Sequence, residues 1–195
     1  MKKIAKTIIW SLLLLSGIAV TLSGCARWPD GPEPPPGEPE YQLQITVEVR
    51  GVINSDEGKY YIVLDTDENP INGPGSDVSY WDDRFYYIKL EDGFFYFAQV
   101  KEGSPTISLA ASSYSENKLQ VTIALSDIGD PSRVDINVLT TDTENNTYDS
   151  LDNYFSIDTT ILGSKPPIDD GLDDSGEGGA DFDLVGVTTV IKTAF

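Results

Sequence analysis

The sequence YQLQITVEV at residues 41–49 alternates without interruption between apolar and polar side chains. Successive side chains of a β-strand point to opposite faces, so this period of two predicts a strand with one buried face and one wet face. The turn-forming residues 54–58 follow, and residues 59–64 are predicted to return as the strand's partner. The chain is therefore expected to contain a half-buried β-hairpin.

Further short apolar runs, bounded by turn residues, continue this pattern. Asp92-Gly93 is a tight hairpin signal, and residues 126–129 are expected to form one helical turn that glycine closes. No segment has the sustained period of 3.6 that marks an amphipathic helix. The remaining strands are predicted near residues 84–90, 94–100, 106–111, 118–125, 134–140 and 154–158. Short strands at this spacing predict an all-β fold, an antiparallel β-sandwich over residues 41–161.

The last part of the chain, residues 162–195, leaves two alternatives open. Residues 163–180 are rich in glycine, proline and acidic side chains and are expected to be mobile. Residues 182–191 are again apolar and β-branched, so they are expected either to form a strand at a sheet edge or to stay disordered. The sandwich therefore has about eight or nine expected strands.

The first 24 residues have the pattern of a secretory signal. Lys2, Lys3 and Lys6 precede an apolar run over residues 7–20, which is shorter than the ~20 residues that a membrane-spanning helix needs. Residues 22–25, Leu-Ser-Gly-Cys, resemble the lipobox of bacterial lipoproteins. The resemblance implies that residues 1–24 are removed and that Cys25 carries diacylglycerol and an acyl chain, which anchor the protein in a membrane. The alternative is an ordinary signal peptide with a chance cysteine.

Residues 25–40 are expected to link this anchor to the sandwich. Residues 29–40 contain six prolines and four acids, so they have nothing to bury and favour an extended spacer. At ~3.1 Å per residue the spacer is roughly 35–40 Å long. The resemblance thus implies a protein of the cell envelope that faces outward from the cytoplasm. Ala26 stands where inner-membrane lipoproteins carry aspartate, which favours the outer membrane if the host is diderm.

Charge and composition exclude several classes of function. Removing residues 1–24 leaves ten basic and 32 acidic residues, a net charge of −22. Such a chain gains nothing from counterion release, so nucleic acid is not an expected partner. Histidine is absent, and the one cysteine is Cys25, which excludes Ser-His-Asp and Cys-His catalysis. Any metal site must then be built from oxygen ligands, which points to calcium.

One acidic run has the spacing of a calcium loop. Asp65, Asp67 and Asn69 follow a predicted strand, and Asp77 lies farther along the same loop. Alternating oxygen side chains can place three ligands on one side of a loop, so these four residues are the predicted calcium site.

The run is not an EF-hand. Pro70 stands where that loop needs glycine, and Ser76 stands where it needs a bidentate glutamate. Residues 142–146 repeat the alternation, with Asp149 and Asp152 behind them. The alternative for both runs is that acidic and amide side chains favour turns because they hydrogen-bond their own backbone.

Aromatic residues are concentrated in residues 80–97, which hold nine of the chain's 20 aromatic side chains. On paired strands these rings must lie on both faces, so one set fills the core and the other is exposed, covered or used for contact. Trp81, Tyr80 and Tyr86 are the predicted ligand-binding residues, since rings beside carboxylates and amides suit sugars and protein interfaces alike. The alternative is that a loop or the C-terminal strand covers them.

Residues 60–67, Trp81-Asp82, 119–129 and 135–142 together resemble the β-sandwiches of the DOMON and family 9 carbohydrate-binding-module domains. The shared features are a strand that ends in an acidic turn, a following tryptophan, and a late strand and turn that end in Ile-Gly. Heme-binding DOMON domains use methionine and histidine ligands, but this chain has no histidine and only Met1. The resemblance therefore implies sugar binding and not heme.

The leading hypothesis is a lipid-anchored extracytoplasmic protein that binds or scaffolds, with a carbohydrate or envelope glycan as its ligand. The alternative is a structural lipoprotein that contacts an envelope protein and has no small-molecule ligand. An enzyme is not expected, because only a carboxylate pair such as Asp82 with Glu91, or Asp65 with Asp77, remains for catalysis.

Overall fold

A computed structural model describes residues 39–69, 71–171 and 178–194. The lipobox resemblance at residues 22–25, the lipidation of Cys25, the cleaved segment 1–24 and nearly all of the linker 25–40 lie outside the described residues. In the part of the chain that is described, no helix has the length and apolar character needed to cross a membrane.

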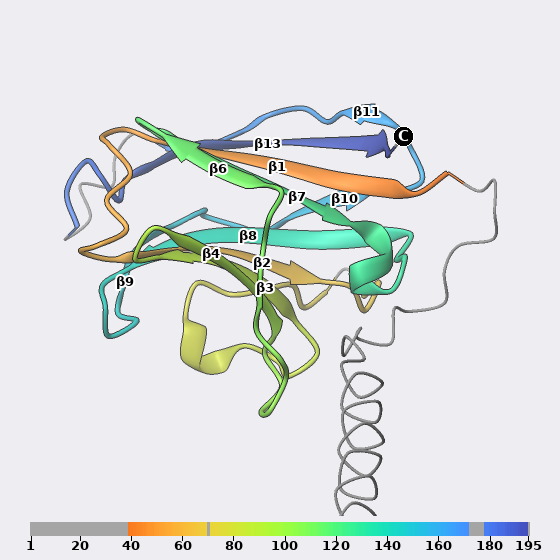
Figure 1. Ribbon diagram of the computed structural model, residues 1–195, viewed down its shortest axis with the longest axis horizontal. Helices are drawn as coiled ribbons and strands as arrows, with labels where there is room; N and C mark the ends of the chain where they lie inside the picture. Colours follow the sequence, from red (N-terminus) through yellow and green to blue (C-terminus); the bar gives the residue numbers. More distant parts are fainter. Residues whose placement is uncertain (1–38, 70, 172–177, 195) are drawn as a thin grey trace, which may run out of the picture. The chain divides into compact units, whose positions relative to one another are not determined.

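The described residues form two antiparallel sheets packed face to face, which confirms the predicted β-sandwich (Figure 1). The β1 sheet has the order β11-β13-β1-β7-β6, with β12 also paired to β13. Its strands are β1 (Tyr41–Val49), β6 (Ser112–Ser115), β7 (Lys118–Ala124), β11 (Gly163–Ser164), β12 (Ile168–Asp169) and β13 (Leu184–Thr193).

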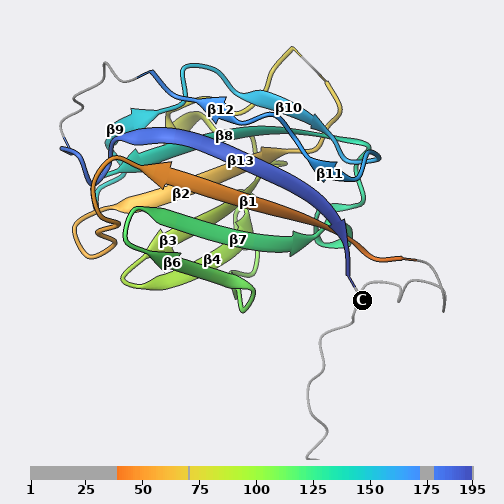
Figure 2. The same cartoon turned by 90° about the horizontal axis from the view of Figure 1, so that it is seen from above.

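The β2 sheet has the order β10-β8-β2-β3-β4-β5, with β9 also paired to β8. Its strands are β2 (Lys59–Asp65), β3 (Tyr86–Glu91), β4 (Phe94–Gln99), β5 (Ile107–Ser108), β8 (Arg133–Thr141), β9 (Thr147–Ser150) and β10 (Phe155–Asp158). Figure 2 shows β1, β7 and β13 lying across the strands of this second layer.

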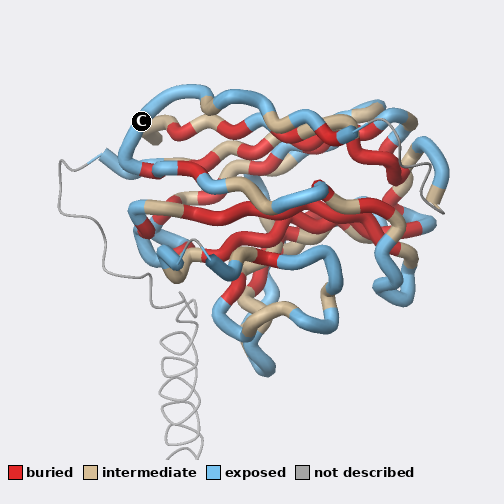
Figure 3. The backbone as a smooth tube through the Cα atoms, turned by 180° about the vertical axis from the view of Figure 1, so that it is seen from behind, coloured by how far each residue is buried: buried red, intermediate tan, exposed pale blue. Residues whose placement is uncertain are grey.

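The core lies between the two sheets and follows the alternation in the sequence. Leu43, Ile45 and Val47 of β1 are fully buried, while the residues between them are only partly buried. Tyr60, Ile62 and Leu64 meet them from β2. Figure 3 shows buried residues concentrated along the strands and exposed residues in the connecting loops. Residues 41–49 and 59–64 were predicted to pair as a hairpin. Instead β1 and β2 belong to different sheets and face each other across the core.

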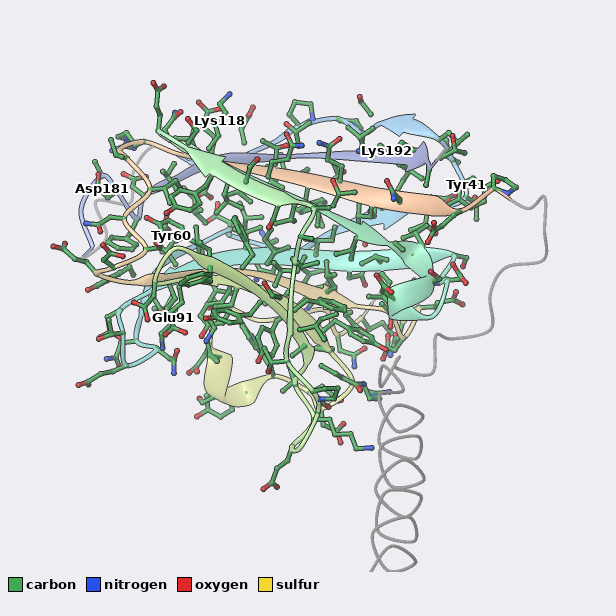
Figure 4. All side chains as sticks on the ribbon, viewed as in Figure 1. Tyr41, Tyr60, Glu91, Lys118, Asp181 and Lys192 are labelled. Carbon is green, nitrogen blue, oxygen red and sulfur yellow. The ribbon has the colours of Figure 1, made fainter. Side chains whose placement is uncertain are left out.

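Tyr60 closes one end of this core. Its hydroxyl accepts a hydrogen bond from Asn54 N at 2.8 Å and donates one to Asp181 O at 2.9 Å. Its ring stacks on Phe182 with the centroids 5.3 Å apart. Burial raises the pKa of Tyr60 to about 12. Figure 4 labels Tyr60 and Asp181 at the end of the molecule opposite Tyr41 and Lys192.

The C-terminal segment forms a strand, one of the two alternatives that the sequence left open. β13 pairs with β1 from Tyr41↔Thr193 to Val49↔Leu184, and it buries Leu184, Val187 and Ile191. It is not an edge strand as expected, because β11 and β12 pair with its other side. Part of the segment 163–180 that was expected to be mobile is therefore bound to this sheet through backbone hydrogen bonds.

The other differences from the predicted strands are local. The strand expected near 106–111 is reduced to β5, and β6 is an additional strand. β9, directly behind the acidic run 142–146, is also an additional strand. The helical turn expected at 126–129 is confirmed as the 3-10 turn η2 (Leu125–Ile128), which ends at Gly129 with φ 87°. The positive φ explains why glycine closes this turn.

Candidate functional site

The loop between β2 and β3 folds back over the outer face of the β2 sheet. Apolar side chains hold it there in an outer cluster, which consists of Tyr61, Val63, Phe85 and Leu139 with Val78, Trp81, Tyr87 and Val100 packed against them. The Trp81 ring meets the Tyr61 ring edge-on at 5.4 Å, and Trp81 Nε1 donates to Gly75 O at 3.0 Å. A loop therefore covers part of this face. That was one of the two alternatives for the aromatic residues.

The structure does not bring the three predicted ligand-binding rings together. Tyr86 faces the core, where it stacks on Phe97 with the centroids 5.8 Å apart. Trp81 belongs to the outer cluster on the opposite face of the sheet. Tyr80, in the 3-10 turn η1 (Val78–Tyr80), is 85% exposed. Of the three residues, Tyr86 alone lies within a strand, and the alternation of side chains along β3 points it toward the core. Tyr80 and Trp81 lie in the loop before β3, where this alternation does not apply.

The residues of the predicted calcium site fold their own loop. Asp65 Oδ1 accepts from Asp67 N at 2.9 Å, Asp67 Oδ1 from Asn69 N at 2.8 Å, and Asn69 Oδ1 from Ile71 N at 3.3 Å. Asp77 caps η1 through Ser79 N at 2.9 Å. The described residues contain no group of three or more acidic side chains placed to hold a metal. Calcium binding therefore stays a prediction, and the spacing has a structural use without it.

Asp65 lies beside a second buried carboxylate. It is the register partner of Asp135 in β8, and both residues are 2% exposed. Asp135 Oδ1 accepts from Arg133 Nε at 3.0 Å and also from Ser156 Oγ. Asp65 Oδ2 is buried and has no hydrogen-bond partner among the described residues. Burial raises the pKa of Asp65, and the charges of Asp67 and Asp135 raise it further, against the hydrogen bond from Asp67 N.

Replacing Asp65 with asparagine should therefore stabilise the fold at neutral pH. When folding raises the pKa of a carboxyl, the protonated form favours the folded state. That stability is fully present below the pKa in the unfolded chain and is lost as the pH rises through the pKa in the folded chain. Asp65→Asn removes the charge and keeps an oxygen for Asp67 N, so we expect the free energy of unfolding at pH 7 to rise by about 1 kcal/mol. Urea unfolding at pH 4 and pH 7 measures this, and the gain should shrink at pH 4.

The matched control is Asp77→Asn. Hydrogen bonds from the Ser79 side chain and backbone lower the pKa of Asp77, so its ionised form contributes stability above the unfolded pKa. The control should therefore be neutral or slightly destabilising at pH 7. A loss of stability in Asp65→Asn as large as in Asp77→Asn would contradict the argument.

The four carboxylates considered for glycosidase chemistry each have their own surroundings. Asp82 is bound by Arg84, with Nε 2.9 Å from Oδ1. Glu91 is bound by Lys59 and Lys89. Asp65 is buried beside Asp135, whereas Asp77 is exposed. Asp82 and Glu91 are therefore each held in ion pairs, and Asp65 and Asp77 differ in their exposure to solvent.

A hollow of about 720 Å³ lies where residues 73–76 run along β9 and the segment that follows it. Two tyrosine rings, Tyr148 and Tyr154, line it together with amide, hydroxyl and carboxylate side chains: Ser76, Asn137, Thr147, Asp149, Ser150, Asp152 and Asn153. Gly73 packs closely on Tyr154, because a Cβ at Gly73 would lie 2.4 Å from the ring. The loop and the ring therefore fit only with glycine at this position.

A second hollow, of about 650 Å³, adjoins the first and is lined by residues 76–79 and 144–147. Thr147 Oγ1 donates to Ser76 O at 2.8 Å, and these two residues line both hollows. We call the two hollows together the hairpin cleft. None of the described residues that line it is lysine or arginine, and the nearby Lys59 ammonium is already bonded to Asn145 Oδ1 at 2.9 Å and to Glu91. The cleft therefore repels anionic ligands and offers neutral or cationic ones many hydrogen-bond acceptors.

The hairpin cleft unites parts of both acidic runs. Asp77 of the first run and Glu144, Asn145 and Asn146 of the second line the smaller hollow together. Asp65, Asp67 and Asn69 do not line either hollow. Sequence reasoning missed Tyr148 and Tyr154, although the stretch YDSLDNY at residues 148–154 places two rings around acidic and amide side chains.

Comparison of the chain with protein-family models, with curated protein sequences and with solved structures gave no match. The lipobox and sandwich resemblances thus depend on the residues quoted for them, and any function must be argued from the site itself.

Proposed function

We propose that this protein is a lipid-anchored, extracytoplasmic binding protein that holds a neutral glycan of the cell envelope in the hairpin cleft. The observation that carries the proposal is the lining of the cleft, where two tyrosine rings stand among amide, hydroxyl and carboxylate groups with no cation. Tyrosine offers an apolar face for a sugar ring and a polar tip for its hydroxyls. The surrounding oxygen and amide groups supply hydrogen bonds that orient a ligand.

The cleft is held in place before any ligand arrives. Asn137 is buried and its Nδ2 donates to Pro74 O at 2.9 Å, which fixes the loop against β8. Asp149 Oδ2 accepts from Leu184 N at 2.7 Å, which ties β9 to the first residue of β13. A preformed site loses less conformational entropy on binding than a mobile one, so these contacts favour affinity. Asp152 and Asn153 remain exposed beside the rings.

Tyr154→Ala should weaken glycan binding at least tenfold, since the loss of one stacking ring and its buried area costs about 1.4 kcal/mol or more. Isothermal titration against neutral envelope polysaccharides and their fragments measures this. Tyr80→Ala is the matched control, because Tyr80 is 85% exposed and lies outside the cleft. Asn153→Ala tests the cleft in a second way without removing a ring, in case Tyr154→Ala is unstable.

Binding that is lost in Tyr80→Ala but retained in Tyr154→Ala would place the ligand instead at the β2–β3 loop, where Tyr80 and Trp81 lie. Failure of the wild-type protein to bind any neutral glycan would sink the proposal. The alternative, a scaffold for an envelope protein, is favoured by Phe94 and Ile107 of adjacent strands β4 and β5, which are 62% and 44% exposed. Partner recovery from solubilised membranes that is lost in Phe94→Asp but not in Tyr154→Ala would support that alternative.

A further inference from the structure

Four reactive side chains meet on the outer face of the β2 sheet, at the end where Figure 4 labels Glu91. Lys59 Nζ lies 2.9 Å from Asn145 Oδ1 and 3.3 Å from Glu91 Oε1. Tyr61 donates its hydroxyl hydrogen to the same Asn145 oxygen, at 2.9 Å. Lys59 is only 7% exposed, although lysine is normally a surface residue. An amine, an amide, a carboxylate and a hydroxyl are thus in contact.

Strand register places three of these residues. Lys59 and Tyr61 are two residues apart in β2, so they project from the same face. Tyr60 pairs with Leu90 in β3, which puts Glu91 beside Lys59. Buried Gly58 allows the chain to pass close to Thr141 O, where a Cβ would lie 2.4 Å away.

A tight turn brings the fourth residue. Asn145 has φ 72°, and its N–H donates to Asp142 O at 3.3 Å. Asp142 Oδ1 accepts from Glu144 N at 2.7 Å and from Asn146 N at 2.8 Å, which fixes the turn from inside. Lys59 Nζ also donates to Thr143 O at 2.8 Å. The turn therefore lies directly over the amine.

We propose that Lys59 and Asn145 become joined by an isopeptide bond within the folded chain. Glu91 takes a proton from the Lys59 ammonium, and the free Nζ lone pair attacks Asn145 Cγ, one bond beyond the oxygen that it now contacts. Tyr61 stabilises the negative charge that develops on Oδ1. Glu91 returns its proton to Nδ2, the Cγ–Nδ2 bond breaks, and Glu91 then takes the second proton that Nζ loses on becoming an amide nitrogen. The released ammonia carries that proton away as ammonium, to solvent from the exposed side of Asn145. One amide is exchanged for another, so no oxidant or cofactor is needed.

The surroundings suit each step. Burial alone would raise the pKa of Glu91, but hydrogen bonds and charges from Lys89 and Lys59 lower it, so Glu91 rests as the carboxylate that can accept a proton. Holding amine and amide in contact replaces an encounter in solution by a reaction within one molecule, which accelerates such steps greatly. The bond would link residues 86 positions apart.

Tryptic peptide mapping of the full-length protein, extracted in detergent, tests the proposal. Cleavage after Arg50, Arg84 and Arg133 separates Lys59 from Asn145. We expect a branched species that joins peptide 51–84, uncut at Lys59, to the peptide that begins at Val134, lighter than their sum by one ammonia. Lys59→Arg and Asn145→Ala should each abolish it. Asn72→Ala, which alters an exposed amide outside this turn and outside the hairpin cleft, should leave it intact.

Glu91→Gln separates catalysis from mere proximity. It keeps the shape of the side chain and removes the proton acceptor, so the variant should fold, as judged by its thermal transition, and yet yield linear peptides. A wild-type protein in which trypsin cuts fully after Lys59, and in which Asn145 is unmodified, would overturn the proposal. A branched peptide of equal yield in Glu91→Gln would overturn the role given to Glu91.

Discussion

A chain that ends after Asp183 should lose its cooperative folding transition altogether. The deletion removes β13, which pairs with β1 along its whole length. It also removes Leu184, Val187 and Ile191 from the core, each at most 2% exposed. Truncating one such side chain to alanine costs about 2–5 kcal/mol. The loss of three, about 6–15 kcal/mol, is therefore as large as the total stability of about 5–15 kcal/mol that is typical of a domain of this kind.

Circular dichroism and tryptophan fluorescence during urea unfolding measure this loss. Thr188→Ala is the control within the same strand, because Thr188 is exposed and its replacement should change stability by less than about 0.5 kcal/mol. A synthetic peptide of residues 184–195, added to the truncated chain, should restore the transition by supplying the missing strand. An unchanged unfolding midpoint in the truncated chain would mean that β13 contributes no stability to the sandwich.

The sequence predicted the strands whose burial pattern is local and left open those that depend on distant partners. The alternation at residues 41–49 identifies the buried face of β1 because half of each period points into the core. β13 has no such clarity: its burial pattern is irregular, Gly186 interrupts it, and an acidic glycine-rich stretch precedes it. What makes it a strand is its pairing with β1, about 140 positions earlier in the chain. No local window contains that information.

The candidate site shows the same division. The acidic runs form turns, as one of the alternatives predicted. Asp65, Asp67 and Asp142 each accept a hydrogen bond from the backbone N–H two residues further along the chain. It was not predictable that both runs would line one hollow, because that depends on how the β2–β3 loop folds back. The alternation of side chains along a strand also does not predict which aromatic ring a loop covers. Trp81 is covered because its loop packs on Tyr61, a contact between residues 20 apart.

Gly58→Ala should lower the free energy of unfolding by about 3 kcal/mol, the upper part of the range for overpacking a core. The added Cβ would lie 2.4 Å from Thr141 O and 2.5 Å from the Phe182 ring. Neither neighbour can easily move. Thr141 is paired with Lys59 in the sheet, and the Phe182 ring lies between Tyr60 and Tyr148, at centroid distances of 5.3 and 5.0 Å. The strain is therefore steric, since Gly58 does not have a positive φ.

Gly75→Ala is the matched control, because no atom lies within 4 Å of the position that its Cβ would take and its φ is also ordinary. It should be neutral, or slightly stabilising through the unfolded chain. Urea unfolding of both variants gives the comparison, and equal stabilities would show that the packing around Phe182 relaxes freely. A loss confined to Gly58→Ala would show that this end of the sheet is rigid. Gly58 precedes Lys59, and Thr141 pairs with Lys59, so a shift at this position should also move Lys59 relative to Asn145 and lower the yield of the proposed bond.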